Sequence, residues 1–131
     1  AGTGNDTIIG GDGIDTLSFS SVSSSISIYL TSTYAQYTAA GYKTISGIEN
    51  LTGGSGSDYL YGDDYANRLD GGKGNDTLLG SSDSETIFGG AGDDTIAGSN
   101  GAGTTTFNGS AGAGLFNGTF ASFLQVEEIV A

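Results

Sequence analysis

Large aliphatic residues recur along this chain at nine-residue intervals, separated by polar and glycine-rich segments. They sit in triplets such as Thr77-Leu78-Leu79 and Thr95-Ile96-Ala97. Successive side chains of a β-strand point to opposite faces, so the middle residue of each triplet faces away from its neighbours. The pattern predicts a column of inward-facing residues formed by Ile8, Leu17, Leu60, Leu69, Leu78, Ile87 and Ile96.

The segments between these residues share a nine-residue template, G-G-x-G-x-D-x-U-x, in which U is a large aliphatic residue. Eight units begin at Ala1, Gly10, Gly53, Gly62, Gly71, Gly80, Gly89 and Gly98. Four of them match every specified position, and the Ala1 unit lacks only the first Gly. A six-residue loop followed by a three-residue strand makes half a coil, so the repeat predicts a flattened parallel helix with 18-residue coils.

These units resemble the repeats of the RTX (repeats-in-toxin) family, the hemolysin-type calcium-binding repeat. The resemblance covers residues 1–18 and 53–106, a little over half of the chain. It implies an all-β parallel β-roll with calcium as the cofactor. A single glycine-aspartate motif is more simply a tight turn without metal, but three such motifs in register at an 18-residue spacing favour calcium.

Loops that lie 18 residues apart fall on the same edge of such a roll. One edge has the fully matching loops that begin at Gly53, Gly71 and Gly89. The other edge has the degenerate loops that begin at Gly62, Gly80 and Gly98. The sequence therefore predicts one strong ion-binding edge and one weak edge.

The candidate calcium ligands are carboxylate and carbonyl oxygens, because Ca²⁺ takes six to eight hard oxygen ligands. Asp58, Asp76 and Asp94 stand at position six of the three matching loops and supply the carboxylates. By resemblance to the family, each ion lies between two stacked loops. The carbonyls carried over are those of Gly53, Gly54, Ser55, Gly56, Gly71, Gly72, Lys73, Gly74, Gly89, Gly90, Ala91 and Gly92.

On the degenerate edge, position six holds Asn67, Glu85 and Gly103. The amide oxygen of Asn67 is a possible ligand, Glu85 is longer than aspartate and Gly103 has no side chain, so at most one ion is expected there. Asp6 and Asp15 are further candidate ligands. Their stacking partners lie either upstream of Ala1 or across the segment that interrupts the repeat.

That segment, residues 19–52, is expected to be a β-rich insert within one domain covering residues 1–131. Ser25–Leu30 alternates like a strand, Thr31–Gly41 reads as a loop, and Tyr42–Leu51 reads as a second strand or irregular ladder. Residues 107–131 resemble the insert. Two interpretations stay open, a cap on the roll or a truncated second insert of a longer array with a period near 79 residues.

Composition and charge exclude several classes of enzyme, metal site and partner. Fifteen acidic residues face three basic ones, for a formal net charge of −12, so bound cations are expected to offset self-repulsion. The absence of His and Cys excludes a Ser-His-Asp triad, an ordinary zinc site and disulfides. No enzyme activity is expected. Three cations are too few for a nucleic-acid partner, and no apolar run reaches the roughly 20 residues of a transmembrane segment.

Seven buried aliphatic residues are too few to order this chain by themselves, so calcium binding is expected to contribute to the folding free energy. The resemblance implies export by type I secretion and folding outside the cell. The sequence thus predicts a secreted or cell-surface structural module, such as an adhesin, surface layer or filament-like scaffold. The outward Tyr61 and Leu79 are covered by the insert or contact copies of the chain or neighbouring repeats. The alternative is an accessory or secretion region of a secreted hydrolase, epimerase or toxin.

Overall fold

The computed structural model describes residues 2–81, 83–98, 106–108 and 115–116, which form strands, turns and loops. The strands are β1 Asp6–Ile9, β2 Thr16–Ser18, β3 Ser27–Tyr29, β4 Gln36–Thr38, β5 Gly41–Ser46, β6 Asn50–Thr52, β7 Tyr59–Tyr61, β8 Arg68–Asp70, β9 Thr77–Leu79, β10 Thr86–Phe88, β11 Thr95–Ala97, β12 Thr106–Asn108 and β13 Leu115–Phe116. None of the described residues belongs to a helix that could cross a membrane.

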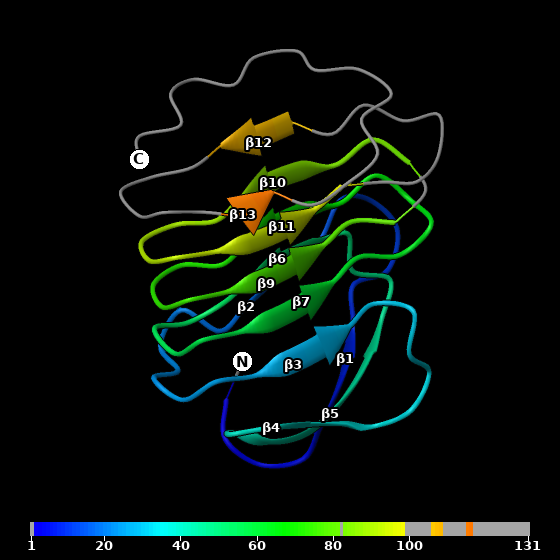
Figure 1. Ribbon diagram of the computed structural model, residues 1–131. Helices are drawn as coiled ribbons and strands as arrows, with labels where there is room; N and C mark the ends of the chain where they lie inside the picture. Colours follow the sequence, from blue (N-terminus) through cyan, green and yellow to red (C-terminus); the bar gives the residue numbers. More distant parts are fainter. Residues whose placement is uncertain (1, 82, 99–105, 109–114, 117–131) are drawn as a thin grey trace.

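Two parallel five-stranded sheets form the body of the molecule (Figure 1). One has the order β12-β10-β8-β6-β2 and the other the order β13-β11-β9-β7-β3. From β6 onward the chain crosses from one of these sheets to the other at each loop, and strands two elements apart pair in parallel. β2 and β3, which precede the insert strands β4 and β5, pair with β6 and β7 respectively. Leu60 lies opposite Leu78, and Leu78 lies opposite Ile96, which is the predicted 18-residue spacing. The prediction of a parallel β-roll is confirmed.

The space between the two sheets is filled by the predicted aliphatic column. Leu17, Leu60, Leu69, Leu78, Ile87 and Ile96 are buried, and Ile8 is partly buried against them. The insert adds Phe19, Ile26, Ile28, Ile45, Ile48 and Leu51 to the same cluster. Each coil is therefore thin, with a core about one side chain deep, and the loops on both edges are never far from solvent.

The insert departs from its predicted structure. Ser25–Leu30 does supply β3, but the expected loop Thr31–Gly41 contains β4, which pairs antiparallel with β5. This strand buries Gln36 and Thr38. Because these residues are polar, the hydrophobic pattern gave no sign of them.

The predicted strand Tyr42–Leu51 is two strands, β5 and β6, which belong to different sheets. Before them, Thr38 forms the turn, since its Oγ1 accepts the Ala40 N–H at 3.2 Å and donates to the Gly41 carbonyl at 2.8 Å.

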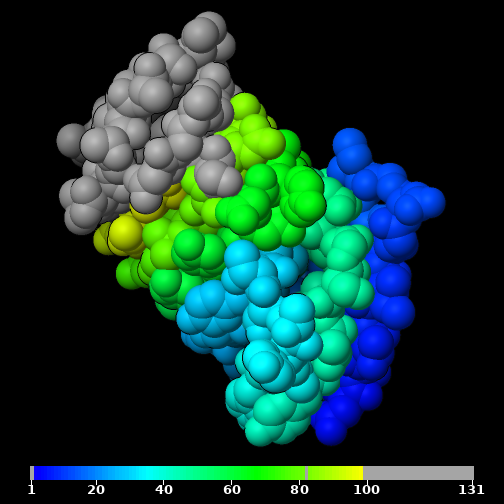
Figure 2. All heavy atoms as spheres, turned by 90° about the vertical axis from the view of Figure 1, so that its right-hand side faces the viewer, coloured from blue at the N-terminus to red at the C-terminus, as the bar shows by residue number. Residues whose placement is uncertain are grey.

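A third sheet, with the order β1-β5-β4, lies at the end of the roll that contains the N-terminus. β1 pairs in parallel with β5, so that Asp6 lies opposite Lys43 and Ile8 opposite Ile45. In the space-filling view the N-terminal segment, coloured blue, runs alongside the blue-green residues around β5 (Figure 2). The insert therefore returns the chain to the first repeat unit.

At the other end, β12 pairs with β10 and β13 pairs with β11, so both sheets continue. The register places Phe107 opposite Ile87. A strict nine-residue unit from Gly98 would have placed Thr105 there, so this last unit does not keep the predicted spacing. Apart from β12 and β13, the predicted cap or second insert at 107–131 lies outside the described residues.

Candidate metal centre

The three fully matching loops, residues 53–58, 71–76 and 89–94, stack on one edge of the roll, which we call the aspartate edge. Backbone hydrogen bonds join each loop to the next. The Lys73 N–H donates to the Gly54 carbonyl at 3.0 Å, and the Ala91 N–H donates to the Gly72 carbonyl at 2.9 Å. The loops thus continue the ladders of the sheets, which keeps equivalent positions of successive units in line.

Position six of these loops forms a column of buried aspartates, Asp58, Asp76 and Asp94. The Asp58 N–H donates to Asp76 Oδ1 at 2.7 Å, and the Asp76 N–H donates to Asp94 Oδ1 at 2.9 Å. At the lower end, the Ile26 N–H donates to Asp58 Oδ1 at 3.0 Å. Each carboxylate is therefore held by the backbone of the coil before it, and Ile26 ends the row.

Both oxygens of Asp58 accept hydrogen bonds, since its Oδ2 also accepts the Gly54 N–H at 2.6 Å, but the carboxylate of Asp76 is only partly satisfied. Among the described atoms, Asp76 Oδ2 is buried without a hydrogen-bond partner. Burial raises the pKa of Asp76 to about 6, against the opposing effect of the Asp58 N–H, and the carboxylates of Asp58 and Asp94 raise it further. Burial likewise raises the pKa values of Asp58 and Asp94. Burial therefore disfavours the ionised form of these aspartates, and a bound cation would favour it.

Glycines let backbone carbonyls face the neighbouring loop. Gly72 and Gly74 have φ values of 95° and 111°, a region that L-residues rarely adopt. A Cβ atom on these residues would contact the carbonyl oxygens of Gly54 and Gly56 respectively. The loops above repeat this, with Gly90 over the Gly72 carbonyl and Gly92 over the Gly74 carbonyl, so carbonyl oxygens line the gaps between stacked loops.

This donor set fits calcium. Within the part of the chain that the structure describes, no three acidic, His or Cys side chains gather closely enough to hold a metal by themselves. Calcium accepts carbonyl oxygens as readily as carboxylates. The aligned carbonyls of the stacked loops can therefore supply the oxygen ligands that the aspartates alone do not provide. The predicted ligands on the aspartate edge are thus brought together in two gaps, with Asp76 between them.

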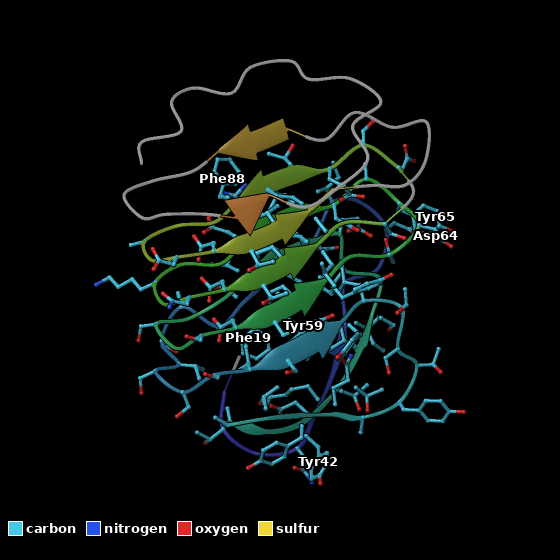
Figure 3. The ribbon with its side chains drawn as sticks, viewed as in Figure 1. Phe19, Tyr42, Tyr59, Asp64, Tyr65 and Phe88 are labelled. Atoms are coloured by element: carbon cyan, nitrogen blue, oxygen red, sulfur yellow. The ribbon has the colours of Figure 1, made fainter. Side chains whose placement is uncertain are left out.

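The opposite edge, which we call the mixed edge and which includes loops 62–67 and 80–85, also links the position-six residues of successive coils. These two loops lack the glycines at positions two and four. Figure 3 labels Asp64 and Tyr65 in the loop after β7. Asn67 and Glu85 are buried. The Asn67 N–H donates to Glu85 Oε2 at 3.1 Å, as Asp58 donates to Asp76.

Both side chains of the mixed edge are used for contacts within the protein. Asn67 Oδ1 accepts the Asp63 N–H at 2.7 Å, and Asn67 Nδ2 donates to the Glu49 carbonyl at 3.1 Å. Glu85, although longer than aspartate, occupies position six beside Asn67 and accepts the Ser81 N–H at 3.4 Å. Burial raises the pKa of Glu85 to about 7. An amide and a carboxyl group that readily takes up a proton thus replace the aspartates here.

Asp15 finds its stacking partner within the insert, at Glu49, and not upstream of Ala1 or across the insert as predicted. Its N–H donates to Glu49 Oε2 at 2.8 Å, and its own Oδ2 is buried without a hydrogen-bond partner among the described atoms. The loop before β6 therefore stacks on the Gly10 loop. Sequence reasoning missed Glu49, although Gly47, Glu49 and Leu51 keep positions four, six and eight of the template.

Asp6 lies at the N-terminal end, and its carboxylate binds the ammonium group of Lys43 at 2.6 Å. Its stacking partner also lies within the insert, because residues 38–46, TAAGYKTIS, form the loop and strand above it. Sequence reasoning missed this unit, since lysine replaces the aspartate at position six. Gly41, Thr44 and Ile45 at positions four, seven and eight were the available signal.

Comparison with known proteins gives one match to a family. The model of the RTX calcium-binding nonapeptide repeat matches in four copies, over residues 1–18, 45–78 and 79–102, which is more than half of the chain. No curated protein matches the chain. The second matched range begins inside the insert, at Ile45, in agreement with the repeat unit that contains Glu49.

Proposed function

Because the chain belongs to the RTX calcium-binding nonapeptide-repeat family, we propose that calcium binding drives its folding and that it is a structural module of a secreted or cell-surface protein. The chain is a calcium-binding β-roll, and calcium is its cofactor. The observation that carries the proposal is the column of Asp58, Asp76 and Asp94, whose buried carboxylates have raised pKa values.

The proposed sites are the two gaps of the aspartate edge. One ion lies between loops 53–58 and 71–76, and a second lies between loops 71–76 and 89–94. Their carboxylates come from Asp58, Asp76 and Asp94, with Asp76 shared. The carbonyl ligands come from the glycine-rich positions of the same loops, namely Gly53, Gly54, Ser55, Gly56, Gly71, Gly72, Lys73, Gly74, Gly89, Gly90, Ala91 and Gly92. Asp15, with its unpartnered Oδ2, is the candidate for a further ion.

The thin core makes these ions part of the fold. Ionised aspartates stacked at every coil repel one another and lack solvent, which destabilises the roll when no cation is bound. Calcium removes this penalty only in the folded chain, where the loops are stacked, so its binding free energy becomes folding free energy. Extracellular calcium modules work at about 10⁻⁴ to 10⁻³ M calcium, and a chain of this kind stays unfolded until it reaches such a medium. That behaviour suits export in the unfolded state.

The architecture supports a structural role. Repeat blocks 1–18 and 53–106 together with the insert 19–52 form one proposed domain. β12 and β13 extend both sheets, and further coils would stack by the same edge pairing. Tyr29, Tyr59 and Tyr61 lie together on β3 and β7, with ring centroids 5.5 and 6.0 Å apart. An aromatic group on a flat sheet is suited to lateral contact with a second roll.

Circular dichroism with calcium and a chelator tests the folding proposal. We expect the far-ultraviolet β signal to rise cooperatively as calcium is added and to be largely lost in excess EGTA, with magnesium as the control cation. A β spectrum that EGTA leaves unchanged would overturn calcium-driven folding. Light scattering on the same samples separates the two roles, since calcium-dependent multimers support a scaffold and a calcium-bound monomer supports the accessory region of a larger secreted protein.

A further inference from the structure

The ammonium group of Lys43 occupies a cage of oxygen atoms between two stacked loops. Nζ lies 2.6 Å from Asp6 Oδ2, 2.5 Å from the Gly4 carbonyl, 2.9 Å from the Gly2 carbonyl and 3.1 Å from the Ala40 carbonyl. The side chain of Lys43 is fully buried. An ammonium group has three protons to donate, so four oxygens around it form a site for a cation and exceed what its hydrogen bonds require.

The oxygens of this cage come from the positions that the aspartate edge also presents. In the first repeat unit, Gly2, Gly4 and Asp6 are positions two, four and six. The same positions in the unit that begins at Gly53 are Gly54, Gly56 and Asp58. Ala40, which supplies the fourth oxygen, is position three of the loop above, residues 38–43.

The two loops also stack as the loops of the aspartate edge do. The Gly4 N–H donates to the Ala40 carbonyl at 2.7 Å, and the Gly74 N–H donates to the equivalent Ala91 carbonyl at 2.9 Å. Gly41 has a φ of 106°, and a Cβ atom there would contact the Gly4 carbonyl. Gly92 stands over the Gly74 carbonyl in the same way. Lys43 therefore takes the place of a position-six aspartate in a normal pair of repeat loops.

Replacing a calcium ion and the upper aspartate by a lysine leaves the net charge of the loop pair unchanged. In a loop pair of the aspartate edge, a calcium ion and the upper aspartate together carry one positive charge. In the N-terminal pair, Lys43 carries one positive charge by itself, and Asp6 below it is retained. The Lys43 side chain extends from the upper loop, so its terminal nitrogen reaches the oxygens of the lower loop.

We infer that the ammonium group of Lys43 replaces calcium between loops 2–6 and 38–43. This pair of loops needs no metal ion, and its cation cannot dissociate. The N-terminal end of the roll, with the β1-β5 pairing, is therefore ordered without calcium, and the calcium-dependent coils of the aspartate edge stack beyond it. Asp6 then serves as the partner of a fixed ammonium group, while Asp58, Asp76 and Asp94 remain the ligands of exchangeable ions.

Hydrogen exchange of backbone amides, measured in calcium and in EGTA, tests this inference. In EGTA we expect the amides of β5 to exchange at least about tenfold more slowly than those of β9. In Lys43→Met, which keeps the stem and removes the charge, β5 should lose this protection in both media. Arg68→Met removes the same charge from the outer face of β8 and is the control, with wild-type protection expected at β5.

Lys43→Asp gives the second measurement, because it restores the position-six aspartate. We expect protection of β5 to become calcium-dependent, and isothermal titration calorimetry to count one more calcium ion per chain than in the wild type. Loss of β5 protection together with that of β9 in wild-type protein in EGTA would overturn the inference, as would an unchanged ion count in Lys43→Asp. Failure of the calcium-dependent folding proposal is a separate outcome, seen as β9 amides that stay protected in EGTA.

Discussion

The aspartate edge and the mixed edge both link successive coils through position six, but they differ in the residues at that position and in the glycines of their loops. On both edges a backbone N–H of one coil donates to the side chain of the next coil, at 2.7 Å between Asp58 and Asp76 and at 3.1 Å between Asn67 and Glu85. On the aspartate edge the column consists of carboxylates with raised pKa values. On the mixed edge an asparagine and a glutamate whose pKa is about 7 take their place.

The difference shows that stacking the coils and binding an ion are separable. A buried column of side chains must satisfy its polar atoms in some way. Among the described residues, the aspartate edge leaves Asp76 Oδ2 without a hydrogen-bond partner, the mixed edge uses an amide that bonds to the coil before it, and the N-terminal pair uses an ammonium group. The roll thus satisfies its buried position-six groups in three chemical ways, of which we propose that only the first requires calcium.

Removal of the charge shared by the two proposed ions should have the largest effect. Asp76→Asn keeps the shape of the side chain but weakens both gaps, so we expect at least about a tenfold rise in the calcium midpoint of folding, or about 1.4 kcal/mol, and the loss of two ions by calorimetry. Asp94→Asn should lose one ion. Equal ion counts in the two variants would contradict the sharing of Asp76.

The control for this pair is Asp83→Asn, which removes the same charge from an exposed residue of the mixed edge. Its calcium midpoint should stay within about twofold of the wild-type value, since exposed charges at a distance are screened by solvent and salt. A shift as large as that of Asp76→Asn would assign the effect to net charge rather than to the column.

A matched pair of glycine substitutions compares the backbone space on the two edges. A Cβ atom on Gly71 would contact Asp76 Oδ2 and the Gly89 carbonyl, whereas a Cβ atom on Gly80 would meet the movable Glu85 Cγ at 2.7 Å. In urea unfolding at saturating calcium, we expect Gly71→Ala to lower the free energy of unfolding by about 1–3 kcal/mol and Gly80→Ala by less. The reverse order would mean that the mixed edge is the tighter one.

The smallest expected effect concerns pH on the mixed edge. The folded-state pKa of Glu85, about 7, lies above its ordinary value of 4.5, so the folded chain binds this proton more tightly than the unfolded chain. Its stabilising contribution is complete below pH 4.5 and is lost as the pH rises through 7. Glu85→Gln mimics the protonated side chain and should raise the melting temperature by a few degrees at pH 8 and by little at pH 5.

Asp12→Asn serves as the comparison for the glutamate variant, because it neutralises an exposed carboxylate. Thermal unfolding of both variants in the same calcium concentration at the two pH values isolates the buried group. If Glu85→Gln and Asp12→Asn respond alike to pH, the ionisation of Glu85 does not limit the stability of the mixed edge.

The repeat could be predicted from sequence wherever each position of the nine-residue template kept its residue type. Period and template together gave the parallel roll, the inner column from Leu17 to Ile96 and the alignment of the three matching loops, because each unit dictates the same local geometry. The prediction failed where polar contacts, rather than a hydrophobic period, hold a strand in place. β4 buries the polar Gln36 and Thr38 against its own neighbours, and no hydrophobic period marks such a strand.

The candidate site shows the same limit. Asp58, Asp76 and Asp94 could be named from the template alone. Lys43 and Glu49 could not, because the template specifies aspartate at position six, and a lysine there reads as a break in the repeat. The return of the insert to the first repeat units brings Lys43 to Asp6 and Glu49 to Asp15, a long-range pairing that spacing does not encode.

The coil geometry also has a mechanical consequence. Neighbouring strands of a sheet are about 4.8 Å apart, so one 18-residue coil adds only that height to the roll. Fully extended, a chain of that length reaches about 60 Å. A pull along the roll axis that frees one coil would therefore add about ten times the height that the coil loses. With the proposed ions bound on the aspartate edge, we expect the force that frees a coil to rise with the calcium concentration of the medium.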